Sequence, residues 1–96
     1  MQYWLEVKNY RNTIFGNDEV WHLSSKYSCE ISNIARVRTI DRIIIQEQAD
    51  KNGVYVDLRG DGTKTYVRDI VDSVFYTEGK IYKDGNKYNN AVSNLI

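Results

Sequence analysis

The spacing of the apolar residues changes at Val67, and this change limits the possible folds more than any other feature of the chain. Residues 54–58 alternate as a half-buried strand does, Gly60-Asp61-Gly62 is a turn signal, and residues 63–67 are rich in strand-forming types. A β-hairpin over 53–67 is therefore predicted. From there on, the apolar residues have the spacing of one helix face, at Val67, Ile70, Val71, Val74 and Phe75. This pattern predicts one amphipathic helix at about 67–76, ending before Gly79.

The rest of the chain contains mostly short strand-forming segments. Strands are predicted at 2–8, 20–23, 30–32, 36–40 and 43–45, with a loop over 9–17 and a break near Asn33. Residues 81–83 followed by a turn at 84–86 predict a second small hairpin or turn, and 89–96 predicts a short helix. The fold class that follows is α+β, a small and mainly antiparallel β domain with one amphipathic helix.

Size and charge restrict the function. A chain of 96 residues predicts a single domain, 1–96, because a second hydrophobic core would be too small to be stable. Thirteen Lys and Arg balance thirteen Asp and Glu, so no overall positive field favours a histone-like role. No apolar stretch suits a signal peptide or a membrane span, and we expect a cytoplasmic protein.

Catalytic groups are scarce. The single Cys29 and the single His22 cannot form a disulfide or a Cys/His zinc site, and no second histidine is present to activate the thiol. The carboxylates Asp61, Asp69 and Asp72 are explained by a turn and by the solvent face of a helix. We therefore predict no catalytic residue, no metal site and no cofactor.

The positive charge is concentrated in residues 20–45, which hold four basic and two acidic side chains. Arg36, Arg38 and Arg42 alternate along a predicted strand or extended stretch, so they are expected to project largely to one side and to reach phosphates. Asn33 and Thr39 are expected to add neutral hydrogen bonds to phosphates or base edges. The alternative is a solvated surface with Glu30 and Asp41 as local ion partners.

Two segments together resemble parts of phage and intron homing endonucleases. Trp21-His22-Leu23 and residues 30–39, EISNIARVRT, are similar to the "W…VSNLGRVRS" pattern of NUMOD4, a DNA-binding motif found beside HNH nuclease domains. Residues 53–58, GVYVDL, and 70–75, IVDSVF, resemble the strands and helix that lead into the HNH fold. Residues 81–95, IYKDGNKYNNAVSNL, are similar to the HNH core "VNHKDGNK.NN..ENLEW". The resemblance implies a NUMOD4-like segment at 20–45 and a degenerate HNH-like segment at 53–96, ending in a remnant of the ββα core.

The same resemblance implies a fold without the chemistry. Tyr82 stands where the family has its general-base histidine, and Ile81 stands at a metal-ligand position. An isoleucine offers Mg²⁺ no donor atom, and an ordinary tyrosine keeps its proton near neutral pH. The central asparagine is kept as Asn94, whereas the family's glycine in the basic motif is Ala35 and its histidine ahead of the helix is Arg68.

Three functions follow as hypotheses. The first is a non-catalytic, phage-type DNA-binding accessory protein that uses Asn33, Arg36, Arg38, Thr39 and Arg42. The second is an inhibitor from a phage or mobile element that blocks a host nucleic-acid-handling protein such as a defence nuclease, of the anti-CRISPR or anti-restriction type. Its contacts would be Asp57, Asp61 and Asp72, together with tyrosines. The third is residual nuclease activity supplied by a partner or by unexpected residues.

Overall fold

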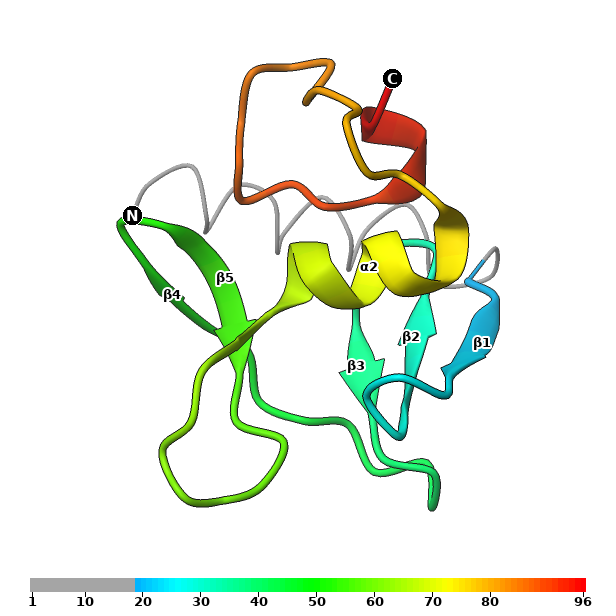
Figure 1. The fold of residues 1–96 in the computed structure, drawn as a ribbon, viewed down its shortest axis with the longest axis vertical. Coiled ribbons are helices and arrows are strands. Elements are labelled where there is room, and N and C mark those ends of the chain that lie inside the picture. Colours follow the sequence, from blue (N-terminus) through cyan, green and yellow to red (C-terminus); the bar gives the residue numbers. More distant parts are fainter. Residues whose placement is uncertain (1–18) are drawn as a thin grey trace.

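The computed structural model describes residues 19–96, so the strand predicted at 2–8 and the loop at 9–17 lie outside the described residues (Figure 1). In the described part, the first antiparallel sheet has the order β1 (Trp21–Ser24), β2 (Cys29–Ser32) and β3 (Val37–Arg38). The second has the order β4 (Gln48–Asp50), β5 (Gly53–Val56) and β6 (Thr65–Tyr66). The helix α2 (Val67–Phe75) and the 3₁₀ turn η1 (Val92–Asn94) complete it. The predicted α+β class is confirmed.

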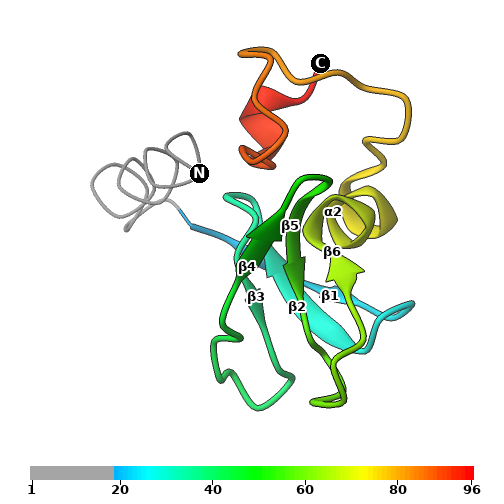
Figure 2. The same ribbon diagram turned by 90° about the vertical axis from the view of Figure 1, so that its left-hand side faces the viewer.

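The helix α2 joins the two sheets into one core. It packs against β1 and β2 of the first sheet and against β5 and β6 of the second, as Figures 1 and 2 show. Its buried residues are Val67, Ile70 and Val71, three of the residues that set the helical spacing in the sequence. Each fully buried aliphatic side chain contributes roughly 1.5–3 kcal/mol, so this shared core ties both sheets to one helix.

The strands beneath the helix alternate as a one-sided sheet requires. On β2, Cys29 and Ile31 are buried while Glu30 is half-buried, and on β5, Val54 and Val56 are buried on either side of Tyr55. The predicted hairpin over 53–67 is confirmed, with Tyr55 opposite Tyr66 and Val56 opposite Thr65.

Three predicted elements differ from the structure. Residues 43–45 form no strand and make only an isolated bridge, Arg38 to Ile44, because the chain turns at 39–43. The helix predicted at 89–96 is reduced to η1. Residues 81–83 form no hairpin across 84–86, since Tyr82 bridges Leu95 instead, but the alternative prediction of a turn is confirmed, because the Gly85 N–H donates to the Tyr82 carbonyl at 3.0 Å. The edge strand β4 was not predicted.

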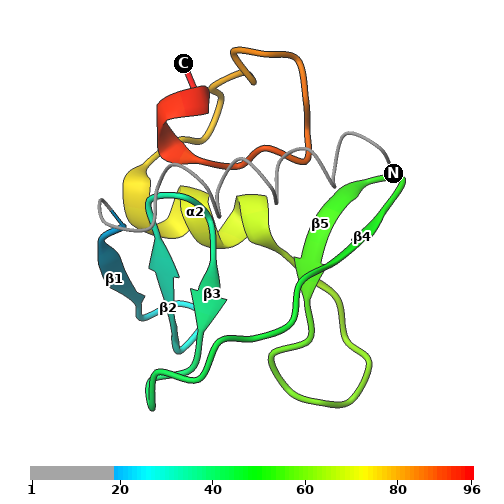
Figure 3. The same ribbon diagram turned by 180° about the vertical axis from the view of Figure 1, so that it is seen from behind.

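The C-terminal segment, 77–96, packs at one end of the molecule. Figures 1 and 3 show it beyond α2, whereas the turn 39–43 and the loop 57–64 extend at the opposite end. The Val92 N–H donates to the Asn33 carbonyl at 2.9 Å, which fixes this segment to the first sheet. No helix among residues 19–96 has the length and apolar character needed to cross a membrane.

Candidate nucleic-acid interface

Two arginines lie against the ring of Trp21 on the first sheet. The guanidinium carbon of Arg38 is 4.1 Å from the ring centroid, and that of Arg36 is 5.6 Å from it. A guanidinium within about 6 Å of an indole ring is attracted by the ring's negative face. The geometry therefore brings Arg36 and Arg38 together beside the Trp21 ring, on one side of the sheet.

Each of these arginines is also held by a carboxylate. Arg36 donates from Nε and Nη2 to the two carboxylate oxygens of Glu19 at 2.8 and 2.7 Å, and this hydrogen bonding raises the pKa of the Arg36 guanidinium further. Arg38 donates from Nε to Glu30 at 2.6 Å, across the β2–β3 pair. The Glu30 contact was the alternative weighed from the sequence, whereas the Glu19 contact was not anticipated. The two pairs fix the arginine geometry and balance two of the positive charges.

The turn between β2 and β3 sets the position of Arg36. The Ser32 hydroxyl accepts from the Arg36 N–H at 3.1 Å, and the Ser32 N–H donates to the Arg36 carbonyl at 2.9 Å. Ala35, at the position where the resemblance has glycine, has a left-handed backbone with φ 65°. This turn therefore forms with an alanine, whose methyl group is buried.

The other three predicted contacts are placed differently from the two arginines. The Asn33 side-chain oxygen accepts from the Val20 N–H at 2.8 Å, so this atom joins the residue after β2 to the residue before β1. Thr39 and Arg42 lie in a turn closed by hydrogen bonds between Thr39 and Ile43. Arg42 has φ 69° and is exposed, so the extended stretch predicted to carry it ends before it. In the sequence, Arg42 lies among Ile40, Ile43 and Ile44, whose side chains are exposed.

The carboxylates predicted for protein contact interact with their own surroundings. Asp57 accepts from the N–H groups of Arg59, Gly60 and Gly62, which shapes the loop 57–64. Asp61 accepts from the Thr63 N–H at 2.9 Å, and hydrogen bonds from Thr63 lower the pKa of Asp61. Asp72 accepts from Arg68 Nε at 3.0 Å and from the Thr77 hydroxyl. All three therefore have structural roles.

The HNH-like segment is organised around Asn94 and Tyr82. Asn94 Nδ2 donates to Asp84 Oδ1 and to the Asn89 carbonyl, each at 2.9 Å, and its Oδ1 accepts from the Asp84 N–H at 3.2 Å. The Tyr82 hydroxyl donates to Asn90 Oδ1 at 2.9 Å. This buried asparagine closes the loop 84–94.

Arg68 stands where the family pattern has the histidine ahead of the helix, and it binds the C-terminal segment to α2. Its Nη2 donates to the carbonyls of Thr77 and Lys80 at 3.0 and 2.7 Å, and its guanidinium carbon is 4.9 Å from the Tyr82 ring centroid. Ile81 is 65% exposed and pairs with Ile96 through two backbone hydrogen bonds. An arginine and a tyrosine thus hold the position where the resemblance has histidines.

The fold is similar to that of an HNH homing endonuclease. A solved structure described as "DNA binding and cleavage by the HNH homing endonuclease I-HmuI" matches with a TM-score of 0.58 and 30% sequence identity, over 79% of this chain and 50% of that chain. The chain thus spans about half the length of that endonuclease. No protein-family model matches the sequence, and neither does any curated protein.

Proposed function

We propose that the protein is a non-catalytic DNA-binding module, a phage-type accessory protein of the host cytoplasm, and that its NUMOD4-like segment 20–45 contacts the DNA backbone. The observation that carries the proposal is the pair of guanidiniums beside Trp21, at 4.1 and 5.6 Å from its ring centroid. The 30% identity to a homing endonuclease described as binding DNA supports it.

The two arginines suit phosphate contact because they are held in place yet retain donors. Arg36 uses Nε and Nη2 for Glu19, and Arg38 uses Nε for Glu30. Among residues 19–96, no further side-chain hydrogen bond is made by either guanidinium, so N–H groups of both remain for phosphate oxygens. A side chain that is already ordered loses less entropy when it binds.

Binding of this kind is weak and only moderately dependent on salt. Three phosphates neutralised by Arg36, Arg38 and Arg42 give a slope of about −3 for log K against log salt concentration. The net charge of zero adds no long-range attraction, and Glu19 and Glu30 reduce the local positive charge. Micromolar or weaker non-specific affinity is expected.

The residues at the HNH-like positions argue against cleavage by this chain. The Ile81 side chain has no atom that can ligate a metal ion, and the Tyr82 hydroxyl donates its hydrogen bond to Asn90. A general base must accept a proton from water, whereas the Tyr82 hydroxyl donates its own hydrogen to an amide oxygen. The third hypothesis, residual nuclease activity, therefore needs residues from a partner or residues of this chain outside the HNH-like positions.

Fluorescence anisotropy with a labelled DNA duplex at physiological salt tests the proposal. Arg36→Ala and Arg38→Ala are each expected to weaken binding several-fold and to reduce the salt slope by about 1. Arg38→Lys keeps the charge but loses the planar guanidinium, so it separates charge from geometry. Lys83→Ala, which removes an exposed cation from the C-terminal segment, is the charge-matched control.

Full DNA affinity of Arg36→Ala and Arg38→Ala, with loss in Lys64→Ala or Lys83→Ala, would show that the interface lies elsewhere. The second candidate function, inhibition of a host nuclease, is favoured by the exposed Tyr76, which is 84% accessible, rather than by the carboxylates. Capture of such a nuclease from nuclease-treated lysate by wild type, and its loss with Tyr76→Ser, would support that alternative. An equal capture by an Asp57, Asp61 and Asp72 triple Asn variant would remove its electrostatic form.

A further inference from the structure

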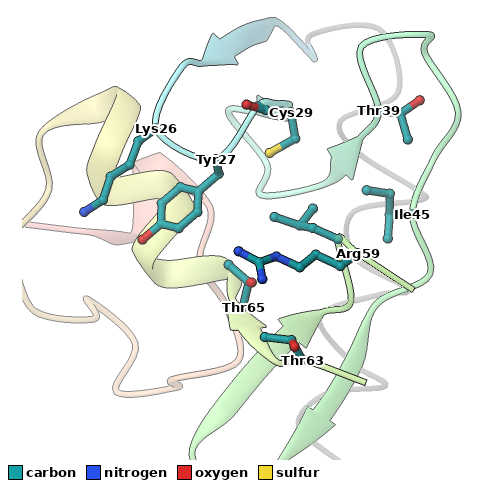
Figure 4. Close-up of a pocket in the computed structure, with 10 residues that line it drawn as sticks. Lys26, Tyr27, Cys29, Thr39, Ile45, Arg59, Thr63 and Thr65 are labelled. Atoms are coloured by element: carbon teal, nitrogen blue, oxygen red, sulfur yellow. The ribbon is translucent and has the colours of Figure 1, made fainter. Parts of the chain in front are cut away.

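A pocket of about 510 Å³ opens between the two sheets, at the end of the molecule opposite the C-terminal segment (Figure 4). Its walls come from the β1–β2 turn, the turn that begins at Thr39, the loop 57–64 and β6. Its volume falls in the range of small-molecule sites, which is roughly 300–1,000 Å³. Thr39, a predicted DNA contact, is one of the lining residues, whereas Arg59, Thr63 and Thr65 take no part in the function proposed above.

The pocket is lined by positive and hydroxyl groups. Its lining includes Lys26 and Arg59 and no Asp or Glu. Hydroxyl-bearing side chains surround these cations, namely Tyr27, Ser28, Thr39, Thr63 and Thr65. Such a combination of cationic and neutral donors is suited to the oxygens of a phosphate.

Arg59 is the central group. In Figure 4 its guanidinium extends into the pocket toward Tyr27. Within residues 19–96 the guanidinium makes no hydrogen bond or ion pair, in contrast to Arg36, Arg38 and Arg68. The nearby carboxylate of Asp57 accepts three backbone N–H groups of its own loop. The carboxylate of Asp61 is bonded by Thr63, and the positive charge of Arg59 also contributes to lowering the Asp61 pKa. Arg59 makes no hydrogen bond to either carboxylate, so its N–H groups remain available to a ligand.

Several hydroxyls of the pocket are available as donors. Those of Tyr27, Ser28 and Thr65 have no hydrogen-bond partner among the described residues, and the Thr39 hydroxyl accepts from the Ile43 N–H, which leaves its own proton free. The Cys29 thiol at the pocket wall adds no charge, because burial, and then the neighbouring Glu30, raise its pKa to about 11. At neutral pH the walls therefore carry positive charge only.

We propose that this pocket binds a phosphate group, with Arg59 as the anchoring cation and the hydroxyls of Thr65, Ser28 and Tyr27 as neutral donors. Lys26, whose ammonium lies 5.4 Å from the Tyr27 ring centroid, adds charge at the rim. The volume exceeds that of a bare phosphate and leaves room for a larger group that carries it. A free nucleotide and a DNA strand are the two sources of phosphate that the test separates. The proposal does not require Arg36 or Arg38 and is testable without DNA.

The first test is a titration of ¹⁵N-labelled protein with inorganic phosphate, followed by two-dimensional NMR, with sodium chloride at matched ionic strength as the control. The amides of Ser28 and Thr65 and the Nε–H of Arg59 are expected to shift and to saturate with phosphate and to stay unchanged with chloride. Arg59→Gln is expected to weaken phosphate binding about tenfold, because it replaces a charge-assisted hydrogen bond with a neutral one. Arg59→Lys should give a smaller loss.

Lys51→Gln is the matched control, because it removes an exposed cation of the β4–β5 turn, which does not line the pocket. Shifts that do not saturate, that occur equally with chloride, or that survive Arg59→Gln at full strength would overturn the proposal. The two sources of phosphate are separated by a deoxynucleoside monophosphate and a short DNA duplex. Saturation by the mononucleotide alone identifies a free nucleotide, whereas Arg59-dependent shifts with the duplex identify a DNA phosphate.

Discussion

Four residues other than glycine have a left-handed backbone in the part of the chain that is described, and they are Ser28, Ala35, Arg42 and Tyr76. This conformation costs an L-residue roughly 1–2 kcal/mol. At Ala35 burial of the methyl group offsets part of the cost, since only 1% of the residue is exposed. Ser28 is one of the proposed phosphate contacts and Arg42 is one of the proposed DNA contacts, and both lie in turns. Backbone strain of this kind is often found at functional sites.

Tyr76 gives a direct test of that cost. It ends α2 with φ 56°, its N–H bonds to the Asp72 carbonyl, and its side chain is almost fully exposed. Tyr76→Gly is expected to stabilise the fold by about 1 kcal/mol, because glycine adopts this C-terminal cap without strain. In a domain of this size that is a rise of about 4–8 °C in melting temperature. Tyr76→Ala, which keeps a Cβ atom, should show no comparable gain in the same thermal scan, and an equal gain would contradict the explanation.

At the scale of elements, helices and strands whose apolar residues recur with a clear period could be predicted from the sequence, whereas elements without such a period could not. The hairpin and α2 follow directly from alternation and helical spacing. The strand β4, with the polar sequence Gln48-Ala49-Asp50, has little strand signal of its own, and it forms because β5 offers it backbone partners. The apolar run 43–45 has a strong signal, yet the turn hydrogen bonds of Thr39 direct most of it to solvent.

The candidate site shows the same division. Arg36 and Arg38 were found by alternation, since side chains two residues apart share one face of a strand. The Glu19 partner and the Trp21 stacking depend on how the turn at Ala35 brings separate segments together. The pocket around Arg59 depends on the spacing of the two sheets, and no local pattern in the sequence reports that spacing.

The packing of α2 against both sheets predicts the effect of a core substitution. Ile70 is fully buried between them, so Ile70→Ala is expected to destabilise the protein by about 3 kcal/mol through lost burial and a remaining cavity. Ile70→Val removes a single methylene and should cost roughly 0.5–1.5 kcal/mol. Urea unfolding, followed by NMR signals of residues in each sheet, measures the loss in free energy of unfolding for the two variants. Separate transitions for the two sheets would contradict a shared core.

At the scale of the whole molecule, the chain combines an HNH-like fold with a neutral charge and altered residues at the HNH-like positions. We expect the purified protein not to cleave plasmid DNA with Mg²⁺ or Mn²⁺. Tyr82→His alone should not create activity, because Ile81 still supplies no metal ligand. A plasmid-nicking assay with the wild type and with Tyr82→His checks both expectations. Divalent-dependent nicking by wild type that disappears in Tyr82→Phe would show that the tyrosine has taken over a catalytic role.

The hydrogen bond from the Val92 N–H to the Asn33 carbonyl also makes the separation of the C-terminal segment from the first sheet measurable. Hydrogen–deuterium exchange at the Val92 amide requires the C-terminal segment to separate from the turn that follows β2. Asn33 is bonded in the same place to Val20, through its side-chain oxygen and its own N–H. The exchange rate at this one amide therefore reports how often two segments some sixty residues apart in the chain lose contact. A ligand that tightens the segment 20–45 will therefore slow deuterium uptake at the Val92 amide of the C-terminal segment, which is bonded to it.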